Sequence, residues 1–184
     1  MKPDTMDKKK ENISVQQAAQ DLATFAIDRA DLKQLLAAIP EKNSVNLTTI
    51  EYELQILKIL SVGWAISFYM AVTDKNKAPL TQMFWEFIRE ISQNISTLTE
   101  TTTGKNLDYF NILKQRLNSY LEIMKEKPEE SQNPANIMGP AFAHICNNNN
   151  DAITILTGTK MFTLTLGAVK EYLNTIEIDE IKLN

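Results

Sequence analysis

The sequence contains a single histidine, His144, and a single cysteine, Cys146. One histidine cannot supply the paired Glu-x-x-His motifs of a di-iron bundle, and the ligands of a structural zinc site are too few. One cysteine also rules out an intrachain disulfide. We therefore expect no metal and no cofactor.

A cysteine–histidine dyad would have to be built from His144 and Cys146. Residues two apart on a helix point to different sides, so the spacing does not favour such a dyad. We interpret Cys146 as a small buried thiol and His144 as a residue at a helix end. The alternative is a partly exposed, reactive thiol beside an imidazole.

Glycine and clustered basic residues are also scarce. The five glycines form no phosphate-binding loop, and the common hydrolase and metalloprotease motifs are missing. The net charge is −4, and the one basic run is Lys8–Lys10. We therefore expect no nucleic-acid partner, and we rank an enzyme last among the functional classes.

The N-terminal residues 1–12 are polar and lack the apolar segment of a secretory signal. We expect 1–12 to be a disordered polar tail and 13–184 to form a single helical domain. With 184 residues the chain can bury a substantial core. A cytoplasmic location is the expectation that agrees with these features.

The most apolar stretch is Ile59–Val72, which carries no charge. Its apolar residues fall on every side of a helix, as in a core helix or a membrane helix. Fourteen residues are too few to cross a bilayer, so no membrane association is expected. Glu51, Glu53 and Lys58 precede the run and indicate a solvated end. We expect a buried central helix over 48–72.

Other segments have helical periodicity and recognisable ends, which together predict an all-α bundle of about six helices. Leu80 to Leu98 form its clearest apolar stripe, and Pro79 suits the first turn of that helix. The expected capping residues are Ser14, Asp31, Thr48, Asn106, Asn133 and Asp151, and the expected helix-ending residues are Pro40, Gly104 and Pro128.

Four details of this fold stay open or unusual. Gly139-Pro140 should kink or restart the helix that contains it. Residues 153–166 are rich in threonine; we favour one helix there over a hairpin that turns at Gly158-Thr159. Residues 128–133 are the expected flexible joint. The tail, 175–184, alternates Ile176 and Ile178 and should be extended.

Polar tips on the apolar central helix suggest a pocket for a small apolar ligand. Its candidate lining residues are Trp64, Phe68, Tyr69, Ser61 and Ser67. The structural alternative is that the serines bond backbone carbonyls and the aromatic rings fill the core.

A second candidate surface is an interface between copies of the chain. Trp85 lies away from the apolar stripe of its helix, next to Arg89, and Ile112 and Ile123 lie at the edge of another stripe. We therefore expect a homodimer. The first functional hypothesis is a protein–protein interaction module with an unknown protein partner, and the alternative is a regulatory domain that binds a small apolar ligand.

Overall fold

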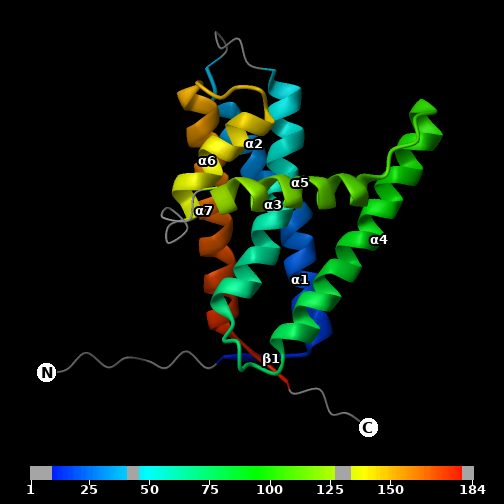
Figure 1. Ribbon diagram of the computed structural model, residues 1–184. Helices are drawn as coiled ribbons and strands as arrows, with labels where there is room; N and C mark the ends of the chain where they lie inside the picture. Colours follow the sequence, from blue (N-terminus) through cyan, green and yellow to red (C-terminus); the bar gives the residue numbers. More distant parts are fainter. Residues whose placement is uncertain (1–9, 41–45, 127–133, 180–184) are drawn as a thin grey trace, which may run out of the picture.

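The computed structural model describes residues 10–40, 46–126 and 134–179, and within them the chain is an all-α bundle (Figure 1). Seven helices and two short strands occur in these residues, against about six helices expected. The elements are β1 (Glu11–Ile13), α1 (Val15–Ile27), α2 (Ala30–Ala37), α3 (Leu47–Tyr69), α4 (Lys77–Thr103), α5 (Tyr109–Glu126), α6 (Pro134–Ile145), α7 (Ala152–Thr175) and β2 (Ile176–Ile178).

Helix α3 is the central helix, as expected, with α6 and α7 on one side and α1 and α4 on the other (Figure 1). Its cap is Asn46, whose side chain accepts from the Thr49 N–H at 3.2 Å, so the expected Thr48 cap is wrong by two residues. The last buried residue of α3 is Ile66. The apolar run was expected to be buried to Val72, but this residue lies beyond the helix and is 91% exposed.

The expected solvated end of α3 is found at Glu51, which is partly exposed, but the expectation is wrong for Glu53 and Lys58. Glu53 is 3% exposed and Lys58 is fully buried. Arg116 of α5 holds Glu53 by two hydrogen bonds, of 2.8 and 2.6 Å. Lys58 donates to the Asp28 carbonyl and to the Asp31 carboxylate, both at 2.9 Å. Charges enter a protein core when such partners replace water.

Two further expected capping residues, Asp31 and Asn106, are corrected by the structure. Asp31 makes no cap: Arg29 occupies the N-cap position of α2, and Asp31 lies one residue inside the helix and pairs with Lys58. At the start of α5, Asp108 rather than Asn106 accepts from the backbone, through the Asn111 N–H at 3.0 Å.

The other helix ends agree with the sequence where the structure describes them. Ser14 accepts from the Gln17 N–H at 3.1 Å, and Asp151 accepts from the Thr154 N–H at 2.7 Å. Gly104 ends α4 with a φ of 69°, a conformation that favours glycine. Helix α2 ends at Ala37, three residues before Pro40, with Ala38 as its C-cap. Asn133, Pro128 and the joint over 128–133 lie outside the described residues.

Helices α6 and α7 form the most extensive helix pair. Pro140 lies inside α6, which is assigned as one helix, so the expected restart does not occur. Residues 152–175 are one helix, so the favoured alternative is confirmed and the hairpin is wrong. The close packing of α6 against α7 explains why residue 158 is a glycine, because a Cβ there would lie 2.6 Å from the Phe142 ring.

Strand β2 confirms the extended start of the tail. Its parallel partner is β1, with Glu11 opposite Ile176 and Ile13 opposite Ile178. Residues 11 and 12 were assigned to the disordered tail, and this is corrected; residues 1–9 lie outside the described residues. The strands bring the N- and C-terminal segments of the chain together at one end of the bundle, below α3 (Figure 1).

Candidate ligand-binding groove

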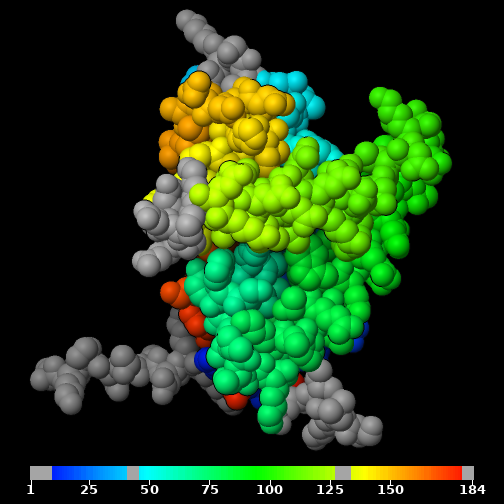
Figure 2. Space-filling model, in the orientation of Figure 1, coloured from blue at the N-terminus to red at the C-terminus, as the bar shows by residue number. Residues whose placement is uncertain are grey.

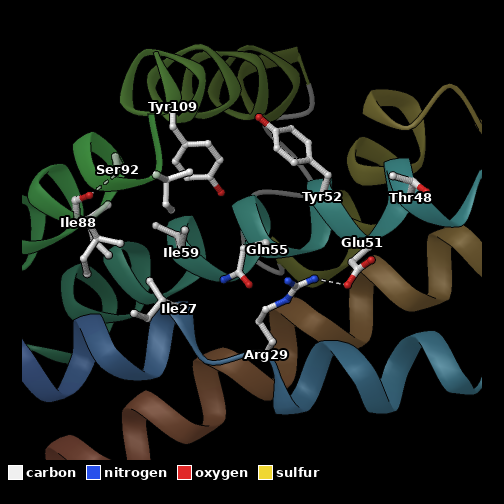
Figure 3. Close-up of a pocket in the computed structure, with 12 residues that line it drawn as sticks. Ile27, Arg29, Thr48, Glu51, Tyr52, Gln55, Ile59, Ile88, Ser92 and Tyr109 are labelled. Atoms are coloured by element: carbon white, nitrogen blue, oxygen red, sulfur yellow. Dashed lines mark hydrogen bonds and ion pairs between the residues drawn. The ribbon is translucent and has the colours of Figure 1, made fainter. Parts of the chain in front are cut away.

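A groove with a cavity volume of about 450 Å³ lies between α1, α3, α4 and α5 (Figure 3). This volume falls in the range of small-molecule sites. Most of its exposed wall surface is apolar, although seven of its twelve lining residues carry a polar group. The lining residues are Ile27, Arg29, Thr48, Glu51, Tyr52, Gln55, Ile59, Ile88, Ile91, Ser92, Ile95 and Tyr109.

One wall is the turn between α1 and α2, which α3 holds in place. The Gln55 amide donates to the Ala26 carbonyl at 2.8 Å, and Lys58 donates to the Asp28 carbonyl. Both carbonyls belong to the end of α1, where backbone acceptors lack partners within the helix. These bonds fix Ile27 and Arg29, the residues that α1 and the turn contribute to the groove.

The opposite wall exists because α4 leans away from the bundle. Along its apolar stripe the exposure rises from 1% at Ile88 to 36% at Ile95 and 64% at Leu98. Figure 2 shows the end of α4 standing apart from the start of α3, with a notch between them. The stripe is therefore longer than the core that it covers, and three of its residues, Ile88, Ile91 and Ile95, line the groove.

Helix α5 closes the groove from one side, and its start is tied to α4. The Tyr109 N–H donates to the Ser96 hydroxyl at 3.1 Å, and this hydroxyl donates to the Ser92 carbonyl at 2.8 Å. Tyr109 is the first residue of α5, so the junction also places its side chain. The ring extends toward α3 (Figure 3) and meets the Tyr52 ring edge to face at 6.1 Å.

The Tyr109 hydroxyl is the polar group most suited to a ligand. The residue is 6% exposed, and within the described part of the chain its hydroxyl has no hydrogen-bond partner. It differs from the Gln55 Oε1 and Tyr120 hydroxyl oxygens, which also lack partners but are sealed from solvent. Burial raises the pKa of Tyr109, so its hydroxyl keeps its proton at neutral pH.

The charged groups of the groove are already paired. Arg29 of the α1–α2 turn forms an ion pair with Glu51 of α3, and both side chains are partly exposed (Figure 3). The pair lies at one end of the groove, away from the isoleucines of α4. The groove therefore offers apolar walls, the neutral hydroxyls of Tyr109 and of the more exposed Tyr52, and a compensated ion pair.

The structure does not bring the residues of the expected pocket together. Ser61 donates to the Leu57 carbonyl at 2.7 Å, as in the structural alternative. The Trp64 ring packs edge to face on Tyr120 and Phe162. The remaining members have other surroundings: Ser67 donates to the Gly63 carbonyl, and Phe68 and Tyr69 are 51% and 40% exposed.

The expected interface residues also differ in their surroundings. Trp85 is half-buried and packs over Gly63, where a Cβ would lie 2.6 Å from its ring. Its own chain thus covers much of the side chain that was expected to face a partner. Ile112 and Ile123 are half-buried against the core, and Arg89 is exposed.

Cys146 and His144 form no dyad. Cys146 is 5% exposed, and burial, followed by the nearby Glu53, raises the pKa of its thiol to about 12. His144 is exposed and its Nδ1 lies 3.1 Å from the Asn149 Oδ1. Among the described residues, no three His, Cys, Asp or Glu side chains are grouped as metal ligands.

The comparisons with known proteins do not add a family. Neither the family models nor the curated proteins nor the solved structures gave a match to the chain. Within the described residues, α7 is the one helix long and apolar enough to cross a membrane by length and composition, and 39% of its apolar window is buried. Core helices of soluble proteins have the same properties.

Proposed function

We propose that this protein is a non-enzymatic binding domain for a small, largely apolar molecule held in the groove between α1, α3, α4 and α5. The observation that carries the proposal is a cavity of about 450 Å³ with largely apolar walls, into which the nearly buried residue Tyr109 brings a hydroxyl without a hydrogen-bond partner among the described residues. Apolar walls with a few polar groups are the usual composition of small-molecule sites.

The proposal keeps the ligand-binding hypothesis but moves its site. The expected pocket lay around Trp64 and Phe68 in the second half of α3, whereas the groove uses Tyr52, Gln55 and Ile59. Regulation by the ligand and a cytoplasmic location remain part of the hypothesis.

A groove-filling variant tests the proposal. Ile95 is 36% exposed and lines the groove, so Ile95→Trp should fold and place an indole where the ligand lies. Leu98→Trp is the matched control, because Leu98 lies on the same helix and does not line the groove. Circular dichroism establishes that both variants keep their helical content.

The readout is binding of the neutral dye N-phenyl-1-naphthylamine, whose fluorescence rises in apolar surroundings. We expect the wild-type protein and Leu98→Trp to bind the dye with similar affinity, and Ile95→Trp to bind it at least tenfold more weakly. Equal binding by all three proteins would place the dye elsewhere and refute the proposal. Absence of binding to the folded wild-type protein would refute it as well.

A further inference from the structure

We infer that the ligand of the groove carries a neutral hydrogen-bond acceptor, such as a ketone, ester or amide carbonyl, which binds the Tyr109 hydroxyl. The inference rests on the proposed function and adds the chemical class of the ligand. It follows from three features of the groove: the unpartnered hydroxyl, the apolar walls and the paired charges.

The hydroxyl selects for an acceptor. A protonated phenol is a good hydrogen-bond donor, and a ligand that displaces water from it without offering an acceptor loses that hydrogen bond. In the described residues no acceptor meets the Tyr109 hydroxyl. The backbone N–H of the same residue, by contrast, donates to the Ser96 hydroxyl. A ligand carbonyl at this point would satisfy the donor that the fold leaves open.

The walls select against an ionised acceptor. A carboxylate in the groove would lose water to isoleucine side chains, and a buried ion without a counter-ion is strongly unfavourable. The cation that lines the groove is Arg29, and it already pairs with Glu51. A carboxylate ligand could reach Arg29 only beside the Glu51 carboxylate, whose negative charge would repel it.

Three compounds with the same carbon skeleton separate these effects. Pentylbenzene has no polar group, valerophenone carries a ketone beside the ring, and 5-phenylpentanoate ends in a carboxylate. Their affinities are measured by displacement of N-phenyl-1-naphthylamine from wild-type protein, Tyr109→Phe and Tyr52→Phe. Both substitutions keep the aromatic ring, and Tyr52→Phe is the matched control because Tyr52 also lines the groove.

Tyr109→Phe should weaken valerophenone binding about 5- to 30-fold, because the carbonyl loses its donor. Pentylbenzene should bind this variant within twofold of wild type, and Tyr52→Phe should leave both affinities nearly unchanged. Wild-type protein should bind 5-phenylpentanoate more weakly than valerophenone.

Other results overturn the inference in distinguishable ways. If Tyr109→Phe left valerophenone binding unchanged, or weakened pentylbenzene equally, the hydroxyl would not recognise an acceptor. Tighter binding of 5-phenylpentanoate than of valerophenone would make the ligand class anionic. If none of the compounds displaced the dye from wild-type protein, the proposed function itself would fail.

Discussion

The buried ion pair between Glu53 and Arg116 allows a sharp prediction, because its two partners differ in exposure. The Glu53 side chain is 4% exposed, and that of Arg116 is 31% exposed. Within the described residues, both hydrogen bonds to the carboxylate come from Arg116. Removing the more exposed partner should therefore harm the fold more than removing the buried one.

The magnitudes follow from what each substitution leaves behind. Arg116→Met strands a carboxylate in the core, which should cost about 3–5 kcal/mol of unfolding free energy. For a chain of this size the melting temperature should fall by about 6–20 °C. Glu53→Met instead leaves a guanidinium that can turn toward water, at a cost of about 1 kcal/mol.

Urea unfolding followed by circular dichroism measures these differences. The double variant, Glu53→Met with Arg116→Met, should unfold within about 1 kcal/mol of wild type, because neither charge remains. Arg89→Met removes an exposed arginine from α4 and should change stability by less than about 0.5 kcal/mol. If Arg116→Met were no more destabilising than Glu53→Met, the exposure argument would be wrong.

Two further predictions concern Cys146 and self-association. A thiol reagent should label Cys146 slowly in the folded protein and rapidly in urea, and rapid native labelling would contradict its burial. The pKa of the Cys146 thiol is about 12 in the folded protein and near 9 in the unfolded chain, so the unfolded chain loses this proton first. The free energy of unfolding should therefore fall as pH rises between these values, by up to about 1.4 kcal/mol per pH unit. The decrease should be smaller in Cys146→Ala, which lacks the thiol. Self-association stays a prediction. Light scattering during size exclusion should give a mass twice that of the 20.9 kDa chain. Trp85→Phe should not abolish the dimer, because the Trp85 ring packs on Gly63 of its own chain.

Local patterns predicted most helices because the information lies within a few turns. Residues 152–175 are the clearest example, since threonine favours strands but can bond the carbonyl four residues earlier in a helix. Thr157 donates to the Ile153 carbonyl at 2.7 Å, and Thr159 to the Ile155 carbonyl at 3.0 Å. With the threonine hydroxyls satisfied in this way, the apolar stripe of residues 152–175 favours a helix over a hairpin. Strand β1 was missed because three residues gain their structure from a partner more than 160 positions away.

The groove could not be predicted because it depends on the direction in which α4 leaves the bundle. Periodicity identifies the residues on the stripe of α4 but not how far along it the core extends. The burial of Glu53 was equally hidden, since Arg116 lies 63 positions away. One signal was present in the sequence. The apolar stripe of α4 continues to Leu98, well beyond Ile88, which is the last buried apolar residue of this helix.

The polar residues of α3 share a structural role that connects the fold to the groove. Within six residues, Glu53 binds α5, Gln55 binds the end of α1, and Lys58 binds the α1–α2 turn. Apolar residues in their place would give comparable stability, because buried ion pairs gain little over hydrophobic packing. These directional bonds also determine position, because they fix the end of α1, which carries Ile27, and the helix that begins at Tyr109. Both residues line the groove, so its shape depends on polar contacts made in the core of the bundle.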